Sequence, residues 1–190
     1  MSDKIDLRVL KTRENIKNTF SSLLLEKDFK NITVQNICDR ALIGRSTFYD
    51  HYCDKYDLLN KMVEEIISKF KPYLKSRFDL NNLDDFTKVG VDVLKLFSKK
   101  KNTIKALINV HTEAVDLYDE LKKLLIEGCS CYLNKSNFVS KYNVSNEYIC
   151  GHYASFVLTS FQLWLELGEN ENNLQLANKM HSILFEGVDI

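Results

Sequence analysis

The scarcity of helix breakers is the feature that most limits what this sequence can fold into. Its 190 residues contain one proline, Pro72, and six glycines. Proline and glycine interrupt helices, whereas the abundant Leu, Lys, Glu and Ile residues are compatible with them. With 45% hydrophobic and 27% charged residues, the composition is typical of a globular protein. We therefore expect an all-α protein.

Apolar residues recur at helical spacing along most of the sequence. About nine helices are expected, over residues 10–26, 34–41, 45–52, 54–71, 86–97, 103–110, 113–133, 146–167 and 174–185. Pro72 should end or kink the fourth of them near Lys71, because proline cannot donate a backbone hydrogen bond. Thr33 is a good N-cap for the second helix, and Asp54 is an N-cap candidate for the fourth. Ser145 or Asn146 can cap the eighth, and Gly168 suits the position just after its end.

Residues 33–52 read as two short helices joined by a tight turn. The second helix carries polar side chains that can meet DNA phosphates and base edges, namely Arg45, Ser46, Thr47, Tyr49 and His51. This is the layout of a helix-turn-helix, in which the second helix enters the major groove. The sequence thus predicts a three-helix DNA-binding domain over residues 1–55 and a C-terminal helical bundle over residues 56–190.

Residues 41–59, ALIGRSTFYDHYCDKYDLL, resemble the helix-turn-helix of the TetR family of transcriptional regulators. The residues that carry the resemblance are Ile37, Ala41, Arg45, Thr47, Phe48, Tyr49, Tyr52, Lys55 and Leu58. It extends over residues 10–70, and the remainder is similar to the family only in length and helical pattern. The resemblance implies a homodimeric repressor, released from its double-stranded DNA operator by a small-molecule effector bound in residues 56–190.

Two positions of the turn depart from the family's pattern. Leu42 stands where the family usually has Gly, and Gly44 stands where it has Ser or Thr. The turn residue often needs φ > 0, which Leu tolerates poorly. We therefore expect Gly44 to take up the bend and to serve as a weaker N-cap for the second helix.

Contacts to DNA phosphates are expected from both ends of the motif. The resemblance implies that Tyr49 and His51 face phosphates and that Lys55 meets one from the start of the next helix. A Tyr hydroxyl and a His N–H are neutral donors, Lys is a point charge, and helix N-termini favour anions. Thr33 and Gln35, at the start of the first helix of the motif, are expected to contact phosphates in the same way. The alternative for Tyr49 is that it covers the small core.

Base reading is assigned to the start of the second helix. The guanidinium fork of Arg45 matches O6 and N7 of guanine. Ser46 and Thr47 lie in the part of the helix that faces the groove, although Thr47 can also serve only as a helix-start hydroxyl. Phe48 and Tyr52 are interpreted as core residues that hold this helix in place.

The charge balance permits DNA binding without arguing strongly for it. The net charge is zero, but residues 1–56 hold ten Lys and Arg against eight Asp and Glu, which gives +2. Residues 57–190 hold the remaining sixteen against eighteen, which gives −2. Such a slight asymmetry indicates only a weak electrostatic preference of the N-terminal part for nucleic acid.

An effector site is expected among the aromatic residues of the C-terminal part, because ligands enter helical bundles between helices. The candidate residues are Phe86, Phe97, His111, Tyr118, Tyr153 and Phe156. The expected ligand is a small apolar or weakly polar molecule. The alternative is a regulator of the same fold that has no small-molecule ligand and is controlled by a protein partner.

Residues 148–165 contain no Asp, Glu, Lys or Arg. At eighteen residues with several polar side chains, this stretch is short for a membrane span of about 20 apolar residues. It is apolar nearly all round, with Ile149, Tyr153, Phe156 and Trp164 near one face and Cys150, Ala154, Leu158 and Leu165 on another. We expect one face to be buried within the subunit and the other in a homodimer interface, packed with residues 174–185 as a four-helix bundle.

The sequence shows none of the common catalytic motifs. A Gly-rich phosphate loop, a Ser-His-Asp order and a His-Glu-x-x-His motif are all missing, so we expect no enzyme activity and no cofactor. Dense titratable groups with perturbed pKa values in one cleft would be the sign of the alternative, an enzyme.

The five cysteines are expected to be reduced thiols of a cytoplasmic protein, because their number is odd and the N-terminus does not read as a signal peptide. Cys129-x-Cys131 and Cys150-x-His152 contain residue types that bind zinc. Residues two apart point about 200° away from each other on a helix, so buried thiols without metal are the better interpretation.

Overall fold

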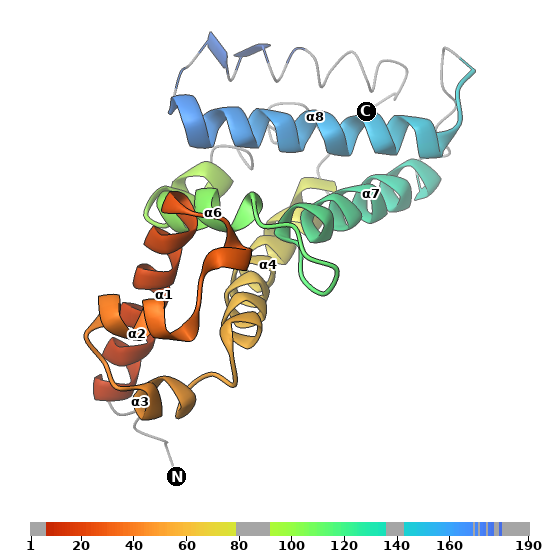
Figure 1. Cartoon of the computed structure of the whole chain (residues 1–190). Coiled ribbons are helices and arrows are strands. Elements are labelled where there is room, and N and C mark those ends of the chain that lie inside the picture. The colour runs from red at the N-terminus through yellow and green to blue at the C-terminus, as the bar shows by residue number, and fades with distance from the viewer. Residues whose placement is uncertain are drawn as a thin grey trace. The chain divides into compact units, whose positions relative to one another are not determined.

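The protein was analysed as a computed structural model that describes residues 7–78, 92–135, 143–168, 170, 172–173, 175–176 and 179. These residues are almost entirely helical, which confirms the all-α prediction (Figure 1). The elements are α1 (Leu7–Glu26), the 3-10 helix η1 (Phe29–Asn31), α2 (Val34–Ala41), α3 (Arg45–Tyr49), α4 (Lys55–Phe78), α6 (Lys101–Ile108), α7 (Leu117–Lys135) and α8 (Asn146–Leu167).

The chain divides into two compact units. The first contains Met1–Ile66 and Asn102–Leu117, and the second contains Ile67–Lys101 and Tyr118–Ile190. Helix α4 therefore contributes its first half to one unit and its second half to the other. The two functional domains predicted from the sequence, residues 1–55 for DNA binding and residues 56–190 for the helical bundle, are a different division and stay a prediction.

The core of the first unit forms where α1 packs on α2 and α2 packs on α3. The apolar side chains Ile16, Phe20 and Leu23 of α1 are buried at helical spacing, with Ile16 and Phe20 completely covered. Ile37 of α2 and Phe48 of α3 are also completely buried, because their spacing turns them toward α1. Burial of these four large side chains is the main source of stability for the three-helix arrangement.

The start of α2 is fixed by a reciprocal capping box. The Thr33 hydroxyl accepts the backbone N–H of Asn36, and the Asn36 side chain accepts the backbone N–H of Thr33, both at 3.1 Å. Lys27 Nζ also donates to Asn36 Oδ1 at 2.8 Å. The predicted N-cap at Thr33 is confirmed, and its side chain satisfies one of the backbone donors left open at a helix start.

The turn between α2 and α3 bends at Leu42, not at Gly44. Leu42 has φ 56° and ψ 44°, whereas Gly44 is extended with φ −72° and ψ 154°. The expectation that Gly44 takes up the bend was therefore wrong. The backbone N–H of Ile43 bonds the carbonyl of Cys38 at 3.1 Å, and this closure of the last turn of α2 requires the left-handed conformation at Leu42.

Helix α4 begins at an aspartate cap and runs further than the sequence predicts. Asp54 Oδ1 accepts the backbone N–H groups of Tyr56 and Asp57, both at 2.8 Å, which confirms Asp54 as the cap. The helix continues through Pro72 to Phe78, so an end near Lys71 was wrong, and the alternative of a kink there stays a prediction. A proline removes one backbone donor, and the surrounding turns of a long helix can continue on either side of that gap.

Three further boundaries differ from expectation. Helix α1 starts at Leu7, and α3 ends at Tyr49, three residues earlier than predicted. Helix α7 starts at Leu117 instead of near residue 113, because Thr112 and Val115 form a side-chain turn just before it, in which the Thr112 hydroxyl donates to the Val115 carbonyl at 2.7 Å. The helix predicted over residues 86–97 is described only from residue 92, and that predicted over 174–185 lies almost wholly outside the described residues.

Helix α8 has the ends that the sequence predicts. The Ser145 hydroxyl accepts the backbone N–H of Tyr148 at 3.2 Å. Gly168 follows the helix with φ 85°, a conformation that favours glycine. None of the described helices is long and apolar enough to cross a membrane.

The exposed face of α8 is not one of the two that the sequence suggested. Both of those faces are largely buried. On the first, Ile149, Tyr153 and Trp164 are buried and Phe156 is half-buried, and on the second, Cys150, Ala154, Leu158 and Leu165 are all buried. A third stripe, with Tyr148, His152, Thr159 and Leu163, is exposed instead. Two apolar faces of one helix can both be buried by other parts of the same chain. The breadth of the apolar surface of α8 was therefore not enough to identify a dimer interface.

Candidate nucleic-acid interface

Helix α3 presents one buried and one exposed side. Phe48 is completely buried and Tyr52, just after the helix, is nearly so, which confirms both as core residues. Arg45 and Ser46 are exposed and Thr47 is half-buried. Tyr49 is 55% exposed, and its ring packs edge-on against buried Phe48 at 5.6 Å, so it covers part of the core while more than half of it stays exposed. A large buried ring thus holds a helix whose polar side chains face outward.

Arg45 is held by side chains of α2. Its Nε donates to Gln35 Oε1, and Gln35 Nε2 donates in turn to Asp39 Oδ1. Gln35 and Asp39 are one turn apart on α2, so both lie on the side of that helix from which Arg45 can be reached. The expected base-reading residue and one of the expected phosphate contacts are therefore joined in the structure.

Lys55 lies at the start of α4, but its ammonium is turned toward the protein. Nζ donates to the carbonyls of Phe29 at 3.0 Å, Lys30 at 3.3 Å and Ile32 at 2.8 Å. It also lies 4.5 Å from the centre of the Phe29 ring. Burial lowers the pKa of Lys55, and neighbouring Asp54 opposes this effect. All three ammonium donors are engaged, so a phosphate contact would require Lys55 to give up part of this arrangement.

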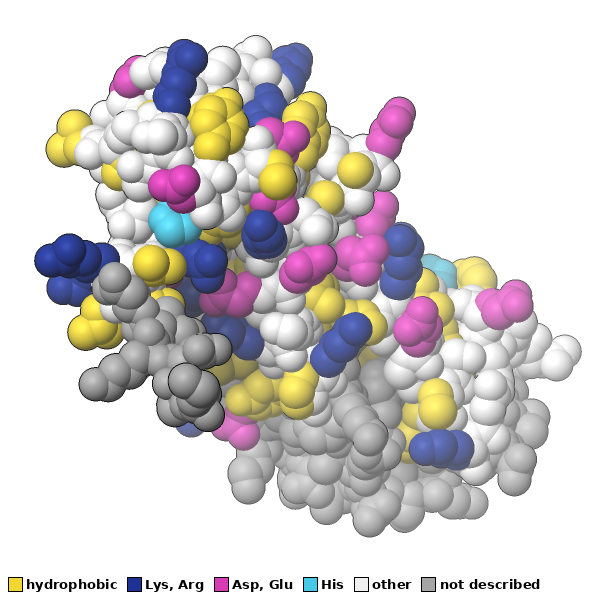
Figure 2. Space-filling view, turned by 90° about the horizontal axis from the view of Figure 1, so that it is seen from below, with side chains coloured by type: hydrophobic (Ala, Val, Ile, Leu, Met, Phe, Trp, Pro, Cys, Tyr) yellow, Lys and Arg dark blue, Asp and Glu magenta, His cyan; other side chains and the backbone are white. Residues whose placement is uncertain are grey.

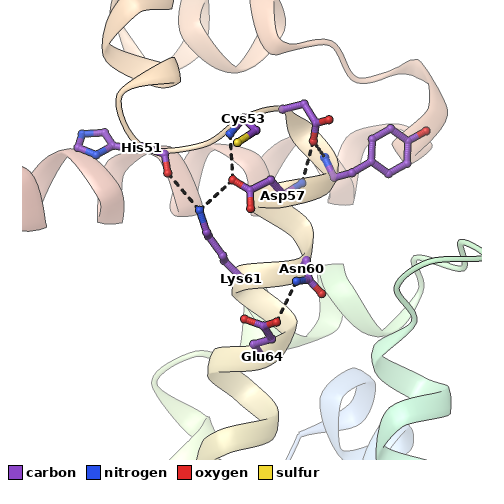
Figure 3. A network of polar contacts seen from close by, with 8 residues as sticks. His51, Cys53, Asp57, Asn60, Lys61 and Glu64 are labelled. Carbon is purple, nitrogen blue, oxygen red and sulfur yellow. Dashed lines mark hydrogen bonds and ion pairs between the residues drawn. The ribbon is translucent and has the colours of Figure 1, made fainter.

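A second polar network holds the turn between α3 and α4 (Figure 3). Asp57 Oδ2 accepts from Lys61 Nζ and from the backbone N–H of Cys53, both at 2.9 Å. Lys61 also donates to the carbonyl of His51 at 3.4 Å. These bonds hold the pKa of Asp57 below its usual value, with the Lys61 hydrogen bond as the largest cause. The His51 imidazole points away from the network, so only its backbone is fixed there.

The electrostatic character of the surface is mixed. Figure 2 shows Lys and Arg side chains in several separate groups, with acidic and apolar side chains between them. This agrees with the small charge excess of the N-terminal residues. Any binding of DNA at this face would depend more on where individual donors lie and which hydrogen bonds they make than on one strongly basic patch.

The expected effector residues do not form one group. Phe97 is buried in the second unit among Phe70, Phe161 and Trp164, with ring centres 5.7 to 6.3 Å apart along the series. Tyr153 is completely buried, whereas Tyr118 and Phe156 are half-buried. Phe86 lies outside the described residues. His111 belongs to the first unit and is mainly exposed, with Nδ1 2.6 Å from Asp116 Oδ2.

The aromatic cluster contains residues that the sequence did not single out. Phe70, Phe161 and Trp164 were not among the expected effector residues, and neither was Lys101, whose Nζ lies 5.3 Å from the centre of the Trp164 ring. Trp164 is only 8% exposed, and its Nε1 has no hydrogen-bond partner in the described part of the chain. The spacing of Phe161 and Trp164 places them together on α8, but only the fold brings Phe70 and Phe97 to them.

Two of the five cysteines are paired without a disulfide. Cys129 of α7 and Cys150 of α8 are buried and hydrogen-bonded to each other, and burial raises the pKa of both thiols. Cys131 is exposed, so the expectation of a buried thiol was wrong at that position, because it faces the opposite side of α7 from Cys129. Among the described residues, no group of three or more His, Cys, Asp and Glu side chains could hold a metal ion.

Comparison with known proteins supports the helix-turn-helix most strongly. No protein-family model matches the chain. Over 72 residues it is 39% identical to the uncharacterized HTH-type transcriptional regulator YxbF of Bacillus subtilis (strain 168). That match covers 37% of the chain but only 19% of the relative, so the chain spans about a fifth of the length of the curated relative it matches.

Two solved structures match nearly the whole chain. A TetR transcriptional regulator from Streptococcus agalactiae 2603V is 25% identical with a TM-score of 0.61, over 92% of this chain and 96% of that one. NalD, the secondary repressor of the MexAB-OprM multidrug efflux pump in Pseudomonas aeruginosa, is 17% identical with a TM-score of 0.68, over 95% and 98%. The chain thus has the fold of TetR-family transcriptional regulators, and over 72 residues it is similar in sequence to an HTH-type transcriptional regulator.

Proposed function

We propose that the protein is a homodimeric, sequence-specific repressor that binds double-stranded DNA through α2 and α3. The observation that carries the proposal is α3 itself, a helix held by buried Phe48 that presents Arg45, Ser46 and Tyr49 outward. Arg45 reads a base edge, while Tyr49 and the capped start of α2 at Thr33 meet phosphates. In a dimer, two such helices fit successive major grooves roughly 34–36 Å apart.

DNA selection tests this proposal directly. The wild-type protein should enrich a two-fold symmetric sequence from a random duplex library, because a symmetric dimer reads two equivalent half-sites. Gel-shift titrations at several salt concentrations should show an affinity that falls with salt. The double variant Arg45→Ala, Tyr49→Ala, shown to be folded by circular dichroism, should lose this binding. Selection of no sequence, or unchanged affinity in the folded double variant, would contradict the proposal.

Release from DNA is proposed to follow binding of a small molecule in the second unit. The support is the cluster of Phe70, Phe97, Phe161 and Trp164, with the buried Trp164 N–H and the nearby Lys101 ammonium. This chemistry suits an apolar molecule that carries a hydrogen-bond acceptor. The molecule must bind the DNA-competent and the released states with different affinities, since otherwise it cannot shift the equilibrium between them.

A compound panel tests the effector proposal. An aromatic or aliphatic compound with a carbonyl or carboxylate group should raise the melting temperature and lower the affinity for the selected DNA. The variant Trp164→Phe keeps the stacked ring but removes the N–H, so it should weaken the response without abolishing DNA binding. If no compound in a broad panel changes either quantity, control by a protein partner becomes the better account.

A further inference from the structure

The geometry points to Gln35 as a positioning residue that orients Arg45 for a guanine, rather than as a contact to DNA phosphate. The inference rests on the proposed DNA binding and adds to it a specificity determinant outside α3. It comes from three side chains, Arg45, Gln35 and Asp39, which we call the Arg45–Gln35–Asp39 network.

The donors and acceptors of the network can be arranged in only one way. A guanidinium only donates hydrogen bonds, and an ionised carboxylate only accepts them. An amide offers both, so Gln35 must turn its oxygen to Arg45 and its nitrogen to Asp39, as observed. Glutamine is therefore suited to link an arginine to an aspartate, and both groups of its amide are used within the protein.

The network also determines which edge of Arg45 remains available. Its Nε is occupied by Gln35, and no hydrogen bond within the described residues uses its two Nη groups. Those groups form the flat end of the guanidinium, which can donate to O6 and N7 of one guanine at the same time. Arg45 is exposed, so without Gln35 its long side chain would sample many rotamers before binding.

Base preference separates this role from a phosphate contact. The probe is the duplex selected by the wild-type protein, together with variants in which each guanine of a half-site is replaced in turn. Arg45→Ala should reduce the preference for one guanine by about 5- to 150-fold, the range of a bidentate base contact. Gln35→Ala should reduce the same preference by about threefold or more, with little change in the affinity for unrelated DNA.

Two substitutions that exchange the amide and the carboxylate between positions 35 and 39 test whether the guanine preference can be lost and then restored. Gln35→Glu should weaken the preference, because the new carboxylate faces that of Asp39. Adding Asp39→Asn should restore the preference, because the new amide can donate to the new carboxylate, which still accepts from Arg45. The matched control is Arg40→Gln, also on α2 but paired with Glu26 of α1 at 2.7 Å, and it should leave the preference unchanged.

The outcomes are distinct. A uniform loss of affinity for all sequences in Gln35→Ala, with the guanine preference intact, would overturn the inference and restore the phosphate role. A restored preference in the double variant, but not in Gln35→Glu alone, would support it. If the wild-type protein selects no DNA at all, the proposed function fails and this inference fails with it.

Discussion

At the scale of single residues, the turn of the helix-turn-helix contains two residues whose types are unfavourable for the backbone positions that they occupy. Leu42 adopts a left-handed conformation with its side chain 91% exposed, so the strain is not offset by burial. Gly44 occupies the N-cap of α3 in an extended conformation, where it offers no side-chain acceptor to the helix start. Glycine would suit position 42 better, and a residue with a side-chain acceptor would suit position 44 better.

Replacing Leu42 with glycine should stabilise the protein. Relief of the left-handed conformation contributes about 1–2 kcal/mol, and the greater freedom of glycine in the unfolded chain cancels about 0.4–1 kcal/mol of it. We expect a net gain of about 0.5–1 kcal/mol in the free energy of unfolding, measured with urea. Ile43→Gly is the control and should destabilise, because Ile43 is partly buried and has no positive φ. A loss of stability in Leu42→Gly would show that the strain argument is wrong.

Replacing Gly44 with serine should also stabilise the protein. An added Cβ would meet only ordinary contacts, with Ser46 Oγ at 3.6 Å as the nearest atom. The new hydroxyl can accept a backbone N–H of α3, and the unfolded chain loses freedom, for a combined gain of about 0.5–1 kcal/mol. Thermal unfolding should show a higher midpoint for Gly44→Ser than for Gly44→Ala, which lacks the hydroxyl. Equal midpoints would mean that the cap does not form.

At the scale of elements, Lys55 joins the start of α4 to the segment before α2. Its ammonium donates to carbonyls within η1 and to that of Ile32 just after it, and it contacts the Phe29 ring. The Phe29 carbonyl also accepts the backbone N–H of Ile32, whereas the carbonyl of Ile32 receives a donor from Lys55. Lys55 thereby positions the start of α2 from a residue more than twenty positions away.

Lys55→Met should therefore reduce the free energy of unfolding by about 1–3 kcal/mol, because it keeps the aliphatic stem and removes the donor to the part-buried carbonyl of Ile32. In folded protein, the salt dependence of DNA binding should stay unchanged. A direct phosphate contact predicts instead that the slope of log affinity against log salt falls by about one unit. Lys30→Met is the control. Lys30 and Asp28 form an ion pair at 3.7 Å, but both side chains are exposed, so its loss should leave stability nearly unchanged.

The junction of α3 and α4 should weaken in acid. The pKa of Asp57 is lowered in the folded state, so its charged form favours folding above the ordinary pKa, and this contribution is lost as the pH falls through the folded pKa. Asp57→Asn should destabilise at neutral pH, and its difference from wild type should shrink near pH 3 or below, under the ordinary Asp pKa of about 3.9. Urea unfolding at both pH values measures this. Asp50→Asn, at an exposed aspartate after α3, should show no such convergence.

At the scale of the whole molecule, the proposed dimer needs a surface, and α8 offers one. Apolar Tyr148 and Leu163 lie on its exposed stripe beside polar His152 and Thr159, and the rings of Tyr148 and His152 are 4.3 Å apart. Large exposed apolar side chains on one face of a helix are typical of a contact between subunits. We therefore place the proposed two-fold interface on this stripe.

Light scattering at micromolar concentration should give twice the chain mass of 22.1 kDa. Leu163→Glu should produce a monomer, because it places a charge in the proposed interface, and it should weaken binding to the symmetric duplex by removing the second half-site contact. Glu147→Gln, at an exposed residue of the same helix that lies off this stripe, is the control. A dimer that survives Leu163→Glu unchanged would move the interface away from this stripe.

The sequence by itself determined the local features of the protein. The helices, the caps at Thr33, Asp54 and Ser145, and the burial of Phe48 follow from residue types at fixed spacing along the chain. The helix-turn-helix and its polar outward residues could be predicted for the same reason, since α2, the turn and α3 are contiguous and their periodicity is short-range.

Only the tertiary structure decided where the long polar side chains go and which helix faces remain exposed. Lys55 reaches carbonyls of residues 29–32, and Arg45 reaches Gln35, because packing brings together segments that the sequence separates. The left-handed bend at Leu42 and the exposed stripe of α8 likewise depend on what covers each surface. A flexible side chain or a broad apolar sector has several favourable local environments, and only the neighbours supplied by the fold select one of them.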